Sequence, residues 1–299
     1  MQGGDVGGTP GVRRGHNSLA DTVVLAFLNR GYRIVDYTDV KGCVDFVAKS
    51  DSNVFVIRVL SNVDALREES VREFVQLAAA VHGTPLIVGE RTKKGSLEDG
   101  VVYRRYGVSV VTPATLERIL DGELPVFEEF KGKRVVYFDS GMFRAAREAA
   151  GLSQSELAVE VGTTKDSIYR YEHGFPASES TARKIIKVLG RDVISPVDLG
   201  YKGYVRSESI MEFRRAPWDV FVSVRESLAL SRARGILQRK INVLRRGAGV
   251  AHDLYAVIAR EDTHVPKDVP VVTEEELAEV KKPDEIVKKV RDELDELEG

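Results

Sequence analysis

The sequence predicts a protein with α/β and all-α parts, arranged as an α/β domain, a central unit of short helices and a second α/β domain. Three observations predict this arrangement. Strand patterns alternate with helical patterns up to about residue 130. Four short helical segments separated by glycines then follow over 141–190. Finally, the last hundred residues repeat strand and helix patterns of the first domain in the same order.

The composition is that of a folded protein with hydrophobic cores. Of the 299 residues, 43% are hydrophobic and 30% are charged, which lies outside the disordered range. Lys and Arg number 44 against 46 Asp and Glu, and the net charge of −2 excludes binding of nucleic acid by bulk charge alone. No apolar run approaches the roughly 20 residues that span a bilayer, and the start lacks a secretory signal. We therefore expect a cytoplasmic protein without membrane contact.

The sequence offers little for cofactor binding or catalysis. The single cysteine, Cys43, permits neither an internal disulfide nor a cysteine-rich zinc site. The five histidines are scattered, and none stands three or four residues from another. Glycine-rich phosphate loops and a Gly-x-Ser-x-Gly elbow are absent. We expect no cofactor, no metal site and no catalytic residue.

The first α/β domain is predicted over 16–130, after a disordered tail over 1–15 that contains six glycines. Its first helix begins with Ser18 as the cap and ends at Gly31. A last helix opens with Thr112-Pro113 and closes at Gly122. Between them the pattern predicts one helix over 65–81 and strands over 32–37, 44–48, 54–60, 86–89, 101–106 and 108–111.

The central domain is predicted over 131–200, with helices over 143–150, 154–161, 165–172 and 181–189. Ser153 and Glu156 form a capping box at the start of the second helix. Gly162 marks a sharp turn, and Thr164 caps the third helix. The third helix buries Ile168 and turns polar side chains outward, which suits insertion into a DNA major groove. The outward residues are Lys165, Asp166, Tyr169 and Arg170, with Ser167 beside them.

These residues resemble a Cro/repressor-type helix-turn-helix, a lambda-repressor-like domain of four or five helices, over 141–190. Gln154 takes the first position of the positioning helix, and Ala158 and Gly162 take the small-residue and turn positions. The resemblance implies that Gln154 braces the DNA backbone and neighbouring side chains of the recognition helix, and that Arg170 lies near a phosphate. It also implies base contacts from Lys165, Asp166 and Tyr169. The expected DNA-binding residues are Gln154, Thr164, Lys165, Asp166, Ser167, Tyr169 and Arg170.

The helical segment itself carries little net charge. Residues 141–190 hold seven basic and six acidic side chains, so this segment alone should bind phosphates weakly. Residues 202–249 hold eleven basic and four acidic side chains, whereas residues 261–299 hold six basic and fourteen acidic ones. The basic segment therefore either tracks phosphates beside the recognition helix or forms a solvated surface balanced by the acidic segment.

The first domain resembles the core of restriction-endonuclease-like folds. Three successive features carry the resemblance, namely a helix, the run Gly42-Cys43-Val44-Asp45 and the strand over 54–58. Such enzymes hold Mg²⁺ with an aspartate at the place of Asp45 and with an acid and a lysine on the next strand. This chain has Val56 and Arg58 at those two positions. One carboxylate cannot clamp a metal and orient water, and a guanidinium transfers protons poorly. We expect a degenerate scaffold kept for dimerisation, ligand sensing or DNA contact.

The second α/β domain, over 201–282, is predicted to be a degenerate repeat of the first. The strongest match aligns 269–277 with 108–116. By the same comparison Asp219 corresponds to Asp45, and Leu230 and Arg232 take the positions of the second acid and the lysine. Trp218 is expected in the core, because Pro217 and an apolar run flank it. Residues 283–299 are predicted to form an amphipathic helical tail that packs on its own domain or on a second chain.

Two further segments allow two interpretations each. The run 103–106, Tyr-Arg-Arg-Tyr, has the pattern of a single-strand or phosphate-binding surface and of an ordinary exposed strand, which we favour. The run 90–94 follows a buried strand, where α/β folds place ligand loops. A charged surface turn is the interpretation we favour there.

The whole chain resembles the archaeal HTH-type transcriptional regulators, in which a nuclease-like part precedes a Cro/repressor-type unit. The resemblance implies sequence-specific binding of double-stranded DNA, control of transcription and no enzymatic activity. Proteins of this kind usually act as dimers on paired half-sites, so we expect a homodimer. The alternatives are a nucleic-acid-processing enzyme or its inactive nuclease-like accessory subunit, and a protein-interaction adaptor. The sequence does not identify a small-molecule effector.

Overall fold

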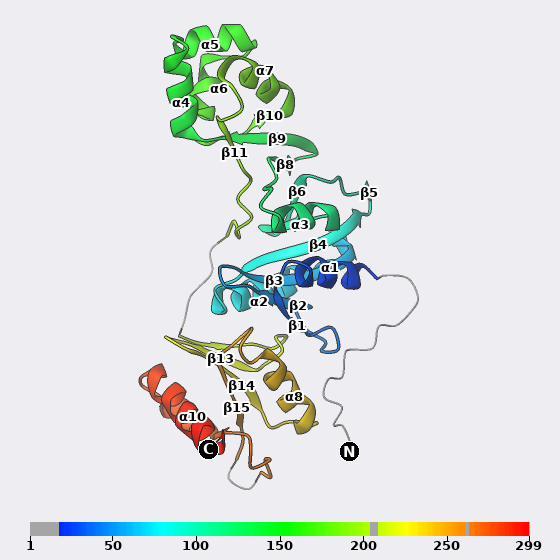
Figure 1. The fold of residues 1–299 in the computed structure, drawn as a ribbon, viewed down its shortest axis with the longest axis vertical. Coiled ribbons are helices and arrows are strands. Elements are labelled where there is room, and N and C mark those ends of the chain that lie inside the picture. Colours follow the sequence, from blue (N-terminus) through cyan, green and yellow to red (C-terminus); the bar gives the residue numbers. More distant parts are fainter. Residues whose placement is uncertain (1–17, 204–208, 261–262, 299) are drawn as a thin grey trace, which may run out of the picture.

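Figure 1 shows the computed structural model, which describes residues 18–203, 209–260 and 263–298. The predicted tail over 1–15 lies outside the described residues. The first helix, α1 (Leu19–Leu28), begins with the capping box of Ser18 and Asp21, so the predicted start is confirmed. The predicted helix over 65–81 is shorter, because a 3-10 turn at Val63–Ala65 precedes helix α2 (Glu68–Ala80).

The N-terminal α/β unit, defined as α1 to α3 with β1 to β7, is built on a mixed sheet. In space the strands follow the order β1-β2-β3-β4-β7-β6, with β5 paired to the end of β4. Strands β3, β4 and β7 run parallel to one another. The strands are β1 (Arg33–Asp36), β2 (Phe46–Lys49), β3 (Val54–Asn62), β4 (Thr84–Thr92), β5 (Gly95–Ser96), β6 (Val101–Arg105) and β7 (Val108–Val111).

Helices cover both faces of this sheet, which explains why its central strands are almost wholly apolar. Val56 on β3 and Ile87 on β4 belong to the core formed with α2. Their neighbours Ile57 and Leu86 point to the opposite face, in the core formed with α1 and α3 (Pro113–Leu120). Strand β3 is therefore buried on both faces over residues 55–57.

The sheet continues beyond this unit through strands that the sequence did not predict. Strand β8 (Phe127–Phe130) pairs with β6, and β9 (Lys133–Phe138) pairs with β8. The short strands β10 (Ala177–Ser178) and β11 (Ile194–Ser195) both pair with β9. The predicted boundary between residues 130 and 131 therefore falls at the turn of the β8–β9 hairpin.

The helical unit, defined as α4 to α7, contains the four helices that the sequence predicts. They are α4 (Ser140–Ala149), α5 (Gln154–Val161), α6 (Lys165–Tyr171) and α7 (Glu179–Leu189). Their common core gathers Phe143, Leu157, Ile168 and Ile185 against Val136 of β9.

The C-terminal α/β unit, defined as β12 to β16 with α8 to α10, repeats the topology of the N-terminal unit. Its strands follow the order β12-β13-β14-β15-β16, with two antiparallel pairings and then two parallel ones, as in β1-β2-β3-β4-β7. The strands are β12 (Ile210–Glu212), β13 (Val220–Ser223), β14 (Ser227–Arg232), β15 (Leu254–Ile258) and β16 (Val271–Val272). The helices are α8 (Leu237–Gly247), α9 (Glu274–Glu279) and α10 (Pro283–Glu298).

Main-chain hydrogen bonds fix the equivalence of the two units. The amide of Asp45 donates to the carbonyl of Ile57 at 2.9 Å, and the amide of Asp219 donates to the carbonyl of Leu230 at 2.9 Å. Asp219 is therefore the counterpart of Asp45, as the sequence predicts.

This register corrects the other two predicted counterparts. Leu230 and Arg232 were expected at the positions of the second acid and the lysine, but each lies one residue too far along β14. Phe221 pairs with Ala229 as Val47 pairs with Val56, so Ala229 and Ser231 take those two positions. A slip of one residue moves every side chain of a strand to the opposite face. Residues 228–231 of β14 are buried on both faces, so their pattern lacks the alternation that would reveal such a slip.

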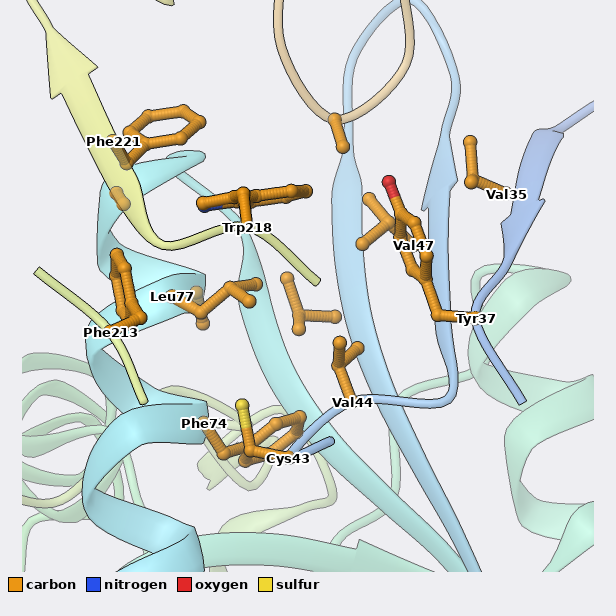
Figure 2. Close-up of a cluster of buried hydrophobic side chains, with 14 of the residues drawn as sticks. Val35, Tyr37, Cys43, Val44, Val47, Phe74, Leu77, Phe213, Trp218 and Phe221 are labelled. Carbon is orange, nitrogen blue, oxygen red and sulfur yellow. The ribbon is translucent and has the colours of Figure 1, made fainter. Parts of the chain in front are cut away.

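The two α/β units pack face to face and share one core, in which α2 and α8 both take part. Figure 2 shows Trp218 and Phe221 of the C-terminal unit beside Tyr37, Phe74 and Leu77 of the N-terminal unit. The ring of Trp218 meets that of Tyr37 edge to face, with centroids 6.0 Å apart. Trp218 is thus a core residue, as predicted, at the seam between the two units.

Polar contacts across this seam follow an approximate two-fold pattern. The carboxylate of Glu73 on α2 accepts hydrogen bonds from the amides of Arg214 and Arg215, at 3.0 and 2.6 Å. In the reverse direction, Arg246 on α8 binds the carboxylate of Asp39 at 2.9 Å. In each case a helix of one unit binds the loop between the first two strands of the other.

The tail helix α10 packs on its own unit, which is one of the two predicted arrangements. Ile286, Val287 and Val290 are buried in the core with β13 and β15, whereas Leu297 near its end is exposed. Within the described ranges, no helix combines the length and the apolar character needed to cross a membrane.

The run over 103–106 was expected to be an ordinary exposed strand or, less favoured, a phosphate-binding surface. The prediction of an exposed strand is wrong. Strand β6 lies between β7 and β8. Arg104 is largely buried and binds the carboxylate of Glu128 at 3.2 Å and the carbonyl of Asp198 at 2.6 Å. At residues 90–94 the structure has the favoured charged turn, where Asp64 accepts a hydrogen bond from the Lys93 amide at 2.8 Å.

Candidate nucleic-acid interface

Helix α6 is set at a sharp angle to α5 by local backbone chemistry. Gly162 adopts a left-handed conformation, with φ of 69° and ψ of 48°, which a residue with a Cβ rarely takes. Two residues later the hydroxyl of Thr164 accepts the amide hydrogen of Ser167 at 3.2 Å and caps α6. Ser167 in turn lies with its hydroxyl 2.9 Å from that of Thr164. These two residues therefore shape the start of the helix.

The sides of α6 differ sharply in exposure. Ile168 is fully buried in the helical core, and Tyr171 is partly buried beside it. The opposite side carries four exposed residues, namely Lys165, Asp166, Tyr169 and Arg170. The structure thus gathers the predicted contact residues of α6 on one open face. In Figure 1 the helical unit forms one end of the molecule, away from the C-terminal α/β unit.

Two aromatic contacts order the far half of this face. The rings of Tyr169 and His173 stack with centroids 4.0 Å apart, and the Nδ1 of His173 lies 2.6 Å from the carbonyl oxygen of Tyr169. The guanidinium of Arg170 lies over the ring of Phe175, 4.7 Å from its centroid. Such contacts reduce the rotamer freedom that these side chains would lose on binding. Sequence reasoning assigned no role to His173 or Phe175.

Gln154 takes part in a buried polar network that ties three helices together. Its Nε2 donates to the carboxylate of Glu172, the residue that ends α6, at 2.6 Å. The Nε of Arg147 on α4 donates to the other carboxylate oxygen at 2.6 Å. Arg147 also binds the carbonyl of Leu152 at 2.7 Å. The network holds α6 against α4 and α5, and Gln154 thereby braces the end of α6 from within the protein.

The basic segment over 202–249 does not flank α6. Its described part from residue 210 onward lies in the C-terminal α/β unit, at the other end of the molecule (Figure 1). Several of its cations are neutralised within that unit, as in Arg232 with Glu274 at 2.9 Å and Arg245 with Asp268 at 2.5 Å. The hypothesis of a phosphate-tracking flank is therefore wrong, and the acidic segment supplies balancing charge as the alternative predicted.

The nuclease-like position around Asp45 is occupied by an internal charge pair. One oxygen of Asp45 accepts the amide hydrogen of Val59 at 2.7 Å, and the other lies 3.4 Å from the guanidinium of Arg58. Burial raises the pKa of Asp45, and the Val59 amide and Arg58 oppose that rise. Val56, at the position of the second acid, is buried and apolar. At this position the Asp45 carboxylate is paired with Arg58, and it is the single carboxylate that the three positions offer to a divalent cation.

The counterpart in the C-terminal unit has the same character. Asp219 accepts the amide hydrogen of Arg232 at 2.8 Å and an ammonium hydrogen of Lys240 at 2.9 Å. Over the described ranges, no group of three His, Cys, Asp or Glu side chains is placed to share a metal ion.

Comparison with known families divides the chain in the same way. The family model of the PD-(D/E)XK superfamily domain matches residues 16–125, and the helix-turn-helix model matches residues 143–194. The fold therefore combines a restriction-endonuclease-like α/β domain with a helix-turn-helix domain. No solved structure matches the chain.

Curated archaeal relatives extend over most of the chain. A protein of Archaeoglobus fulgidus is 32% identical over 237 residues, which cover 72% of this chain and 77% of the relative. A protein of Pyrococcus horikoshii is 27% identical over 308 residues, covering 92% and 98%. A protein of Thermococcus gammatolerans is 26% identical over 299 residues, covering 90% and 94%. All three carry the name "Putative HTH-type transcriptional regulatory protein".

Proposed function

Because the chain belongs to the archaeal family of HTH-type transcriptional regulatory proteins, we propose that it reads specific sequences of double-stranded DNA with α6 and controls transcription by occupying them. The observation that carries the proposal is the open polar face of α6, held by a buried network to α4 and α5. Insertion of this face into a major groove brings Lys165, Asp166 and Tyr169 to base edges and Arg170 to a phosphate. Thr164 and Ser167 shape the start of the helix, and Gln154 supports it.

The charge of the helical unit supports action as a homodimer. Seven basic against six acidic residues over 141–190 give one unit little attraction for phosphates. Two chains on paired half-sites, about 34 Å apart, double the number of contacts. A strictly monomeric mass in light scattering at high protein concentration, free and with DNA, would reject this part of the proposal.

The nuclease-like units are proposed to act as a scaffold and not as an enzyme. Asp45 and Asp219 are both engaged by main-chain amides and cations of their own unit. The working domains that we propose are 16–130, 131–200 and 201–282, followed by the helical tail over 283–299.

Selection of bound sites from random duplex DNA by the full chain tests this function. We expect an enriched sequence whose footprint disappears when the α6 face is altered. The matched control is Arg72→Ala, which changes an exposed cation on α2 in the N-terminal unit. Retention of DNA at low salt without any enriched sequence would reject specific reading. No retention at low salt would favour an adaptor that binds proteins.

A further inference from the structure

Helix α7 has a second face, turned away from the helix-turn-helix core. Ile185 points into that core, whereas the buried Ala182 contacts both the core and the cleft described next. The other face borders a cleft of about 780 Å³ between α7 and the strands β8, β9 and β11. One long side of the cleft is thus a helix of the helical unit, and the other is the hairpin that continues the sheet of the N-terminal unit.

The walls of this cleft are apolar and incompletely covered. Val126, Phe127, Ile186 and Ile194 line it and are only partly buried, and the buried Val136 and Ala182 complete its apolar lining. Protein interiors are close-packed, so apolar side chains beside open space leave room for an apolar guest. The size of the cleft is that of a small-molecule site, since such sites usually measure about 300–1,000 Å³.

The rim of the cleft is cationic. Arg183, Lys187 and Arg191 border it, against the single carboxylate of Glu179. Glu179 is already bound by Arg183 at 2.6 Å and lies 3.6 Å from Arg134. In the part of the chain that the structure describes, no carboxylate lies within 4.0 Å of the charged groups of Lys187 or Arg191. Two cations are therefore available at the edge of an apolar cleft.

We propose that this cleft binds a small amphipathic anion, with an aliphatic or aromatic body against the apolar walls and one anionic group at Lys187 and Arg191. Duplex DNA does not fit this description, because its phosphates bring no apolar body into the cleft. A bound guest would contact both α7 and the β8–β9 hairpin, and so would set the position of the helical unit on its neighbour. The site goes beyond the proposed DNA reading and can be tested without DNA.

The test uses the full chain and the fluorescent anion 1-anilinonaphthalene-8-sulfonate as the probe. We expect one probe molecule per chain, displaced by decanoate and by decyl phosphate but not by decanol at equal concentration. Lys187→Gln combined with Arg191→Gln should weaken probe binding about fivefold to tenfold, as expected for two partly exposed charge contacts. Ile186→Trp, which fills the cleft, should abolish it. The matched control is Lys184→Gln, on the same helix but outside the cleft.

Each contrary result overturns the proposal. Equal displacement by decanol would show that the rim does not select an anion. Unchanged binding in the double variant, or equal weakening in the Lys184→Gln control, would place the probe elsewhere. Probe binding that falls as the protein concentration rises would show that a second copy of the chain occupies the cleft. Decanoate and decyl phosphate acting unequally would support the site and identify its preferred head group.

Discussion

Arg147 and Glu172 form an ion pair inside the helical unit, with Nε 2.6 Å from Oε1. Their side chains are 10% and 1% exposed, so both charges are removed from water. Removal of one partner from such a pair strands the other charge, whereas the intact pair adds little net stability. Because Glu172 caps the end of α6, the pair also fixes the far end of that helix.

Arg147→Met should destabilise the helical unit by about 3–5 kcal/mol, because it leaves the Glu172 carboxylate buried without its cation. Hydrogen exchange of the α5 main-chain amides measures this locally. Fluorescence does not, since the single tryptophan, Trp218, lies at the seam of the α/β units.

The control for this variant is Arg144→Met, which alters an exposed arginine on the same helix. Its amides should exchange as in the unmodified protein. Equal protection in both variants would show that the Arg147–Glu172 pair does not hold the unit together.

Two substitutions on α6 should weaken DNA binding in different ways. Lys165→Ala should cost about 1–3 kcal/mol on the selected site and relax specificity at one base pair, if this lysine reads a base edge. Arg170→Ala should weaken binding to all sequences and lower the salt slope by about 1, because a phosphate contact carries no sequence information. Titrations at several salt concentrations separate the two. Unchanged footprints in both variants would remove α6 as the recognition helix.

Features set by short-range chemistry could be predicted from the sequence. Ser18, Ser153 and Thr164 are caps whose partners lie three residues away, and glycines such as Gly162 end helices through their own backbone conformation. The exposed face of α6 followed from helical spacing once Ile168 was recognised as buried. These elements depend little on distant parts of the chain.

Features set by long-range pairing could not be predicted in the same way. Strand β9 finds its partners in β8, β10 and β11, the last two of which are separated from it by three or four helices. Arg147 and Glu172 are charged, and charged residues are mostly exposed, so their burial had no signal in the pattern. The two interpretations of the basic segment over 202–249 could not be separated, because a charge count says nothing about which carboxylates lie opposite.

The full chain should not nick supercoiled plasmid DNA in the presence of Mg²⁺ or Mn²⁺. Hydrolysis with one or two metal ions needs several oxygen ligands around an activated water. Asp45 and Asp219 each offer a single carboxylate, and each of these carboxylates already binds a main-chain amide and a cation of its own unit. An agarose-gel assay over hours measures this, with Asp45→Ala as the matched preparation. Cleavage that disappears in Asp45→Ala would establish a nuclease and overturn the scaffold role.

His252 should make the seam between the α/β units sensitive to acid. Its side chain is buried, and over the described residues neither ring nitrogen has a hydrogen-bond partner. Burial lowers the pKa of His252 to about 4, from 6.5 in an exposed chain, against opposing contributions from the Leu254 backbone, the Asp253 charge and the Leu244 backbone. The folded state therefore holds a neutral imidazole, and protonation favours the unfolded state.

The direction and size of the acid effect follow from the difference between the pKa of His252 in the folded protein and its pKa in an exposed chain. The contribution of a neutral His252 is fully present above pH 6.5 and is lost as the pH falls from 6.5 towards 4. Between pH 7 and pH 5 the loss amounts to about 2 kcal/mol of unfolding free energy. Trp218 reports on it directly, because its ring centroid lies 5.4 Å from that of His252 and it is the only tryptophan in the chain.

Urea unfolding followed by Trp218 fluorescence at pH 7 and pH 5 measures the change. His252→Gln, which keeps a polar side chain of similar size but does not titrate, should lose about 2 kcal/mol less than the unmodified protein over this interval. His82→Gln, an exposed histidine at the end of α2, is the control and should keep the full pH dependence. If the unmodified protein and His252→Gln lose the same free energy between the two pH values, another group governs the acid sensitivity of the seam.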